Sequence, residues 1–251
     1  MKTALPRRLC AVLAAVMLAG CTVSAPRAPA RHTLNDPDSA ASVQGGGAAF
    51  ANSLDHPDSR YYVVNDFYNM KSGGSLHLLE QFATYQQTTE FSCACASALM
   101  VLHWYGVTDY DELTLCEMAG TDPETGTTPE ALAALFEGLG WQVEAHIAPE
   151  PAFDSAEAWA QYLTARIDEG TPVLVDWQDW GGHWQVVIGV DGCGTDSVWD
   201  DVMIFADPYD VTDHYQDGYY TYPLGRFFTM WAEGHAEGRA PCAQPYLAER
   251  P

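Results

Sequence analysis

The segment from Gln87 to Gly106 constrains the fold most, because it reads as a polar loop that leads into one buried helix. Ser92 is suited to cap the start of this helix, and Gly106 to the position after its end. The alanine, leucine and methionine residues between them favour helix and occupy nearly every side of it. We therefore expect a buried helix over about 93–105, with Cys93 on its first turn.

The rest of the pattern predicts helices first and strands later. Helices are expected at 110–118, 128–140 and 156–169, with one more near 224–233. Strands are expected at 141–147, 172–177, 184–190 and 202–206. This order favours an α+β domain in which N-terminal helices, including the buried helix, pack on a mostly antiparallel sheet. We assign residues 57–251 to that domain.

The N-terminus is typical of an exported protein. Residues 1–21 combine a basic start with a short apolar run, too short for a comfortable membrane span, and end at Leu-Ala-Gly-Cys21. This ending resembles the lipobox of bacterial lipoproteins, in which the cysteine carries the lipid. The alternative is an ordinary signal peptide or an uncleaved anchor. Residues 22–56 are rich in Ala, Pro, Ser and Gly and are predicted to be a flexible tether.

Composition excludes several classes of partner. The 251 residues carry 34 acidic and 11 basic side chains, a net charge of -23. Nucleic-acid binding and a basic membrane-surface patch both need clustered Lys and Arg, so neither is expected. We expect a monomer that acts on a peptide or protein substrate, needs no cofactor or metal, and reaches the membrane only through its lipid anchor.

Three side chains are candidates for thiol chemistry. Cys93 near a helix N-terminus lies where backbone N–H groups favour a thiolate, although a lone cysteine is more often buried or in a disulfide. His183 follows two glycines and precedes a strand, and Asp207 follows another strand. If these strands form a hairpin with 183 opposite 207, its centre falls at 195, in a glycine-containing turn. Asp207 could then orient the His183 imidazole, as in a catalytic triad.

These segments resemble the papain-like cysteine peptidases related to the bacteriocin-processing (double-glycine leader) peptidases. The resemblance covers roughly 84–208 and includes the Gln-x5-Cys spacing, the Gly-His-Trp-Gln-Val-Val-Ile-Gly run and Ala-Asp-Pro. It implies a papain-like fold with Cys93 as nucleophile, His183 as general base and acid, and Asp207 as orienting residue. Gln87, rather than its neighbour Gln86, would donate to the oxyanion.

The chain departs from this family directly after Cys93, where Ala94-Cys95 replaces the usual Gly-Pro. With Cys93 free to react and Cys21 lipidated, four cysteines could form two disulfides in an oxidising compartment. One pairing is Cys95 with Cys116 and Cys193 with Cys242, although sequence does not fix connectivity. A Cys93-x-Cys95 metal pair is a further alternative, but its spacing is not that of a zinc site.

The leading hypothesis is an extracytoplasmic, lipid-anchored thiol hydrolase that cleaves peptide or amide bonds through a Cys93 thioester. An acyl or peptidyl transferase on the same fold is one alternative, and a catalytically inactive peptide-binding lipoprotein is another. The tryptophans at 177, 180 and 184 could line a substrate cleft, although aromatic residues at such positions are more often core.

Overall fold

The computed structural model describes residues 28–35, 59–177, 182–212, 214–233 and 243–251. In these parts the chain is an α+β domain, as the sequence predicts. Helices α2 (Cys93–Trp104), α3 (Glu112–Ala119) and α4 (Pro129–Gly138) come early, and α5 (Ala156–Asp168) and α6 (Leu224–Glu233) follow. The strands are β1 (Leu76–Leu78), β2 (Gln142–His146), β3 (Val173–Trp177), β4 (His183–Asp191), β5 (Val202–Ala206), β6 (Tyr219–Pro223) and β7 (Tyr246–Arg250).

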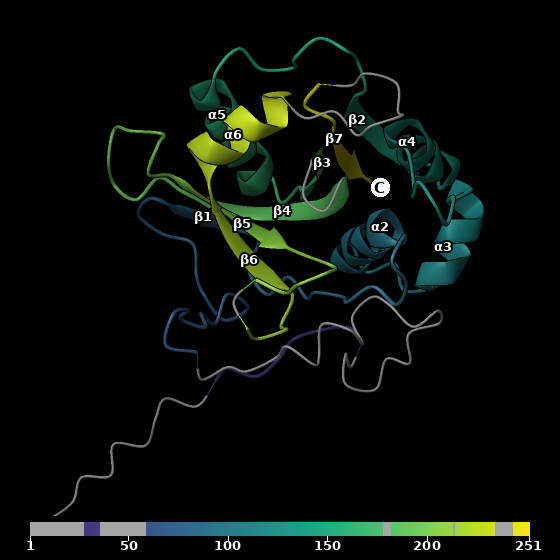
Figure 1. Cartoon of the computed structure of the whole chain (residues 1–251), viewed down its shortest axis with the longest axis horizontal. Coiled ribbons are helices and arrows are strands. Elements are labelled where there is room, and N and C mark those ends of the chain that lie inside the picture. The colour runs from purple at the N-terminus through teal and green to yellow at the C-terminus, as the bar shows by residue number, and fades with distance from the viewer. Residues whose placement is uncertain (1–27, 36–58, 178–181, 213, 234–242) are drawn as a thin grey trace, which may run out of the picture.

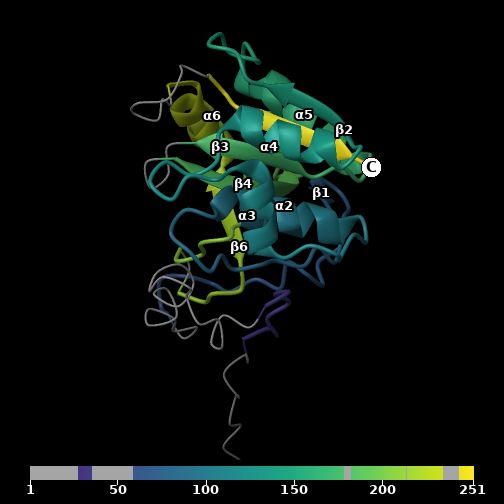
Figure 2. The same ribbon diagram turned by 90° about the vertical axis from the view of Figure 1, so that its right-hand side faces the viewer.

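One antiparallel sheet forms the centre of the domain. Its strands lie in the order β2-β7-β3-β4-β5-β6, and the short β1 also pairs with β4. Helices α2, α3 and α4 lie on one side of this sheet, and α5 and α6 lie on the other (Figure 1, Figure 2). β4 is therefore covered on both faces, which explains why its sequence is almost continuously apolar.

Alternation along β4 separates the two layers of the core. Trp184, Val186 and Ile188 pack in the cluster with α2, whereas Val187 packs in the cluster with α5 and α6. The two described tryptophans near His183, for which the sequence left core and cleft wall as alternatives, each belong to one of these two clusters. Trp177 and Trp184 are buried in these clusters, so they are core residues, and residue 180 lies outside the described ranges.

Helix α2 is the buried helix that the sequence predicts. Ala94 through Leu102 are all buried. The Ser97 hydroxyl donates to the Trp184 carbonyl at 3.1 Å, which joins α2 directly to β4. Ser92 occupies the N-cap position, but within the described chain its side chain makes no capping hydrogen bond. The prediction that the Ser92 side chain caps the helix is therefore wrong. Its hydroxyl donates to the Glu112 carboxylate, as described below.

Two features of the fold differ from the sequence-based expectation. The sequence predicts one helix and no strand after residue 210, yet this region also contributes β6 and β7. Residues 28–35 belong to the predicted tether, yet they lie against the domain, where Thr33 forms an isolated parallel β-bridge with Thr84. Asn35 accepts a hydrogen bond from the Gln86 backbone N–H at 2.9 Å and donates to its carbonyl at 2.7 Å. In the part of the chain that the structure describes, no helix has the length and apolar character that a membrane crossing requires.

Candidate active site

Cys93 opens α2, so its side chain lies at the helix N-terminus. The residue is half-buried, while the next nine positions of the helix lead into the core. Unpaired backbone N–H groups of the first turn give this end a partial positive charge. Because no side chain of the described residues caps the first turn, these groups are left to interact with an anion. The Ala94-Cys95 replacement does not disturb this geometry, since the helix begins at Cys93.

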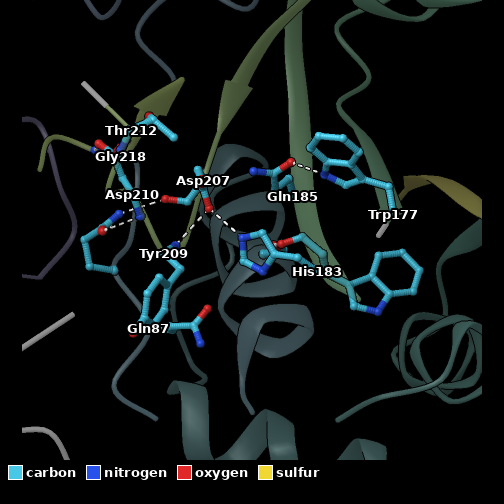
Figure 3. Close-up of polar contacts among 12 residues, drawn as sticks. Gln87, Trp177, His183, Gln185, Asp207, Tyr209, Asp210, Thr212 and Gly218 are labelled. Carbon is cyan, nitrogen blue, oxygen red and sulfur yellow. Dashed lines mark hydrogen bonds and ion pairs between the residues drawn. The ribbon is translucent and has the colours of Figure 1, made fainter. Parts of the chain in front are cut away.

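His183 begins β4 and is almost fully buried. Its Nε2 lies 2.7 Å from Asp207 Oδ1 (Figure 3). Nδ1 is therefore the ring nitrogen left for Cys93, whose thiol also interacts with the imidazole. Burial by itself lowers the pKa of His183, but the Asp207 carboxylate and then the Cys93 thiol outweigh it and hold that pKa well above its usual value. The site thus favours the imidazolium form of His183.

Asp207 is held by its own backbone and by its neighbours. It follows β5, is 1% exposed, and donates its backbone N–H to the Gly218 carbonyl at 2.8 Å. Its Oδ1 also accepts from the Tyr209 N–H at 2.9 Å (Figure 3). The Gln86 side chain donates to the Asp207 carbonyl at 2.8 Å. A carboxylate fixed in this way can hold the imidazole in one orientation and one tautomer.

The hairpin register differs from the predicted one. Between β4 and β5, Val186 pairs with Ala206 and Val187 pairs with Phe205. Extended by one residue, this register places Gln185, not His183, opposite Asp207. A bulge between Val187 and Gly189 then shifts the pairing, and a loop over 192–201 replaces the predicted tight turn. The displacement at the open end is two residues, so His183 stays on the same face and its side chain still reaches Asp207 diagonally.

Gln87 and Gln86 have different surroundings. The Gln87 backbone N–H donates to the Pro208 carbonyl at 2.8 Å, so the glutamine is tied to the segment that carries Asp207. Its buried side chain donates to the Thr89 carbonyl at 2.7 Å, and its Oε1 has no hydrogen-bond partner among the described residues. An amide group has two N–H donors, so one of them remains for a ligand. The Gln86 side chain, in contrast, is occupied at Asp207.

Gln185 is a polar residue near the site that the sequence reasoning missed. It is fully buried two positions after His183, and its Oε1 accepts from Trp177 Nε1 at 2.7 Å (Figure 3). Within the described chain its Nε2 has no hydrogen-bond partner. The available signal was the period of two, which places it on the His183 face of the strand.

The cysteines do not form the expected disulfide. Cys95 and Cys116 are neighbours, as predicted, but both are free thiols. The hydrogen bond with Cys116 lowers the pKa of the Cys95 thiol, and this same bond, together with burial, raises the pKa of Cys116. Cys193 is also free and is exposed. Residue 242, its predicted partner, lies outside the described ranges, as does the predicted lipidation site at 21.

The thiols of Cys93 and Cys95 point to different partners, which corrects the alternative that treated them as a metal pair. Cys95 lies 3.3 Å from the Thr121 hydroxyl and contacts Cys116, whereas Cys93 interacts with His183. Residues two apart on a helix do not face each other, so the two sulfur atoms do not converge.

Residues 77–219, more than half of the chain, match the family described as papain-like cysteine protease AvrRpt2. No curated protein is significantly similar in sequence. One similar solved structure is the peptidase domain of Streptococcus ComA, a bifunctional ABC transporter involved in quorum sensing. It has a TM-score of 0.45 and 17% identity, and the match covers 68% of this chain and 98% of that one.

Two further solved structures are similar at the same distance. The double glycine motif protease from an AMS/PCAT transporter, solved with a leader peptide, has a TM-score of 0.43 and 14% identity over 66% of this chain and 89% of that one. UfSP from C. elegans has a TM-score of 0.41 and 13% identity over 74% of this chain and 36% of that one. Structural likeness at this distance adds nothing to the family match.

Proposed function

We propose that this chain, a papain-like cysteine peptidase that belongs to the family of AvrRpt2, hydrolyses peptide or related amide bonds through a thioester on Cys93. The observation that carries the proposal is the 2.7 Å contact between His183 Nε2 and Asp207 Oδ1, combined with the interaction of the same imidazole with the Cys93 thiol. A nucleophile, a base and a group that orients the base thus follow one another in space.

The first half-reaction forms the acyl-enzyme. The Cys93 thiolate attacks the substrate carbonyl carbon, and the carbonyl electron pair moves onto oxygen. The Cys93 backbone N–H and a Gln87 side-chain N–H would donate to this oxyanion. As the intermediate collapses, the C–N bond breaks and the His183 imidazolium gives its proton to the leaving amine. The products are a free amine and a thioester, with neutral His183.

The second half-reaction restores the enzyme. Neutral His183 takes a proton from water as the water oxygen attacks the thioester carbonyl. The C–S bond then breaks, the acid is released, and the thiolate–imidazolium pair forms again. Asp207 stabilises the imidazolium and keeps Nδ1 directed at Cys93 through both steps.

We further propose that the enzyme works outside the cytoplasm and is held at a membrane by a lipid attached to Cys21. The support is the basic and apolar N-terminal segment that ends in Leu-Ala-Gly-Cys21. Metabolic labelling of the full chain with a clickable fatty acid tests the anchor. Incorporation that disappears in Cys21→Ala supports it, whereas labelling that is equal in the two chains refutes it.

Turnover of a peptide library by the full chain, analysed by mass spectrometry, tests the activity. We expect fragments with new amino termini, which are absent with Cys93→Ala and His183→Ala. Cys193→Ser is the matched control, because Cys193 is an exposed thiol in the loop that joins β4 and β5, at the opposite end of this hairpin from His183 and Asp207. Cleavage that persists in Cys93→Ala would refute the proposal. Products joined to an added amine instead of water would show the transferase alternative.

A further inference from the structure

The loop between Gln87 and Cys93 controls the spacing of the two proposed oxyanion donors. One donor is the Gln87 side chain, and the other is the backbone N–H of Cys93. Residues 87–92 form neither helix nor strand, so no regular backbone ladder holds them. Since oxyanion donors act only when they are fixed at the correct distance, something outside the loop must hold it in place.

The Glu112 carboxylate is the group that contacts this loop at both ends. Glu112 is the first residue of α3 and is 2% exposed. Its Oε1 accepts from the Thr88 backbone N–H at 2.9 Å and from the Ser92 hydroxyl. Its Oε2 accepts from the Thr88 hydroxyl at 2.7 Å and from the Tyr85 hydroxyl at 3.0 Å.

The positions of these donors in the chain show what the carboxylate does. Thr88 directly follows Gln87, and Ser92 directly precedes Cys93, so one buried side chain holds both neighbours of the proposed donors. The Ser92 hydroxyl donates to Glu112 and accepts from the Thr89 hydroxyl at 2.6 Å, and the first turn of α2 has no side-chain cap among the described residues.

Helix α3 provides a firm base for this contact. Asp111 caps the helix by accepting from the Thr114 N–H at 2.8 Å, so Glu112 is not needed as the cap of its own helix. A carboxylate in a first turn is also favoured by the helix macrodipole. α3 packs on α2, where Cys116 contacts Cys95 one turn further along.

We propose that Glu112 is a positioning residue that fixes the oxyanion loop of the active site. The inference rests on the proposed peptidase function and deepens it. Every contact at Glu112 is donated to the carboxylate, which matches a group that has only acceptors. A glutamine at this position keeps the shape but offers one acceptor oxygen. Its amide hydrogens would face the donors of the loop, and at least one of them would lose its partner.

Steady-state kinetics of Glu112→Gln in the full chain test the proposal, with Glu117→Gln as control. Glu117 lies on the same helix but is exposed. We expect Glu112→Gln to lower kcat by about 10- to 100-fold and to leave KM within about twofold, because a displaced oxyanion donor affects the transition state more than substrate binding. Glu117→Gln should match the parent. Equal kcat values in the two variants would overturn the proposal.

A double-mutant cycle with Gln87→Ala separates positioning from loss of stability. If Glu112 acts through the loop, the fold-decrease in kcat caused by Gln87→Ala should be about ten times smaller in the Glu112→Gln background than in the parent. Additive effects would overturn the proposal, because a variant that is merely less stable leaves the Gln87 contribution intact.

A second variant covers the case in which Glu112→Gln fails to fold. Thr88→Val removes only the 2.7 Å hydroxyl contact and should lower kcat by a few-fold, again without change in KM. An unchanged kcat in this variant would overturn the proposal. An inactive parent chain is a different result, since it overturns the proposed peptidase function and the role of Glu112 with it.

Discussion

Replacement of Asp207 by asparagine is the sharpest test of the electrostatic part of the site. The substitution keeps the size and shape of the side chain and one acceptor oxygen. That oxygen can still accept from His183 Nε2 and from the Tyr209 N–H, the two donors that meet at Oδ1. What Asp207→Asn removes is the negative charge beside a buried imidazole.

The expected effect follows from the geometry of the pair. Two unit charges about 4 Å apart attract each other by about 4 kcal/mol at the effective dielectric constant of about 20 found in proteins. The retained hydrogen bond offsets part of this loss. Because about 1.4 kcal/mol corresponds to a tenfold change in rate, kcat/KM should fall by about 100- to 1000-fold. Burial would then dominate at His183 and lower its pKa, so the alkaline limb of the pH–rate profile should move to lower pH.

The assay is kcat/KM for the best library peptide as a function of pH. Asp196→Asn is the control, because Asp196 is exposed in the loop at the opposite end of the β4–β5 hairpin. Thermal unfolding should show that both variants are folded at the assay temperature. A folded Asp207→Asn variant that keeps kcat/KM within about threefold of the parent would refute the assignment of Asp207 as the partner of a charged His183.

Three other perturbations give distinct outcomes. Gln87→Ala should lower kcat by about 100-fold with little effect on stability, because it removes an oxyanion donor. Gln86→Ala should instead lower the free energy of unfolding by about 1–3 kcal/mol, because it leaves buried groups unpaired. The reverse pattern in kinetics and urea unfolding would contradict these two roles. Glu249 is fully buried, neither of its carboxylate oxygens is hydrogen-bonded within the described residues, and burial raises its pKa well above the ordinary value of 4.5. The folded state therefore holds a proton that the unfolded state releases, so stability should fall by about 1.4 kcal/mol per pH unit as pH rises from about 4.5 toward the folded-state pKa. Glu249→Gln should remove this decrease in the free energy of unfolding, as measured by urea unfolding at a series of pH values. The same pH dependence in parent and variant would refute the claim that Glu249 causes the decrease. Asn35→Ala should lower the free energy of unfolding by about 1–2 kcal/mol, through the loss of two hydrogen bonds to the Gln86 backbone; unchanged unfolding would show that residues 28–35 do not stabilise the domain.

The parts of the fold that sequence could predict are those where local signals agree with the tertiary structure. Helix α4 begins where Thr128 and Pro129 indicate, and the Thr128 hydroxyl accepts from the Ala131 N–H at 3.2 Å. The apolar strands β3, β4 and β5 lie where their β-branched residues place them. The contact between His183 and Asp207 could be anticipated because both residues stand at the ends of consecutive strands.

Other parts depend on contacts between segments that are distant in sequence. β7 is short and pairs with β2 and β3, strands that precede it by more than sixty residues, so its own sequence carries little signal. Glu112 looked like an ordinary acid in the first turn of a helix. Its importance lies in donors from residues 85–92, which no local pattern connects to it. The length of the loop over 192–201 likewise depends on packing, and it moved the register that a simple count had set.

The most direct test of the central claim is the rate at which each cysteine reacts with iodoacetamide, measured by peptide mass spectrometry on the folded chain. The account predicts that Cys93 is modified first and that the buried Cys95 stays unmodified. The exposed Cys193 should follow slowly, because partial burial and the neighbouring aspartates raise the pKa of its thiol. His183→Ala should slow Cys93 to the rate of Cys193. A Cys93 that reacts no faster than Cys193, and that ignores His183→Ala, would contradict the claim that these residues form a catalytic pair.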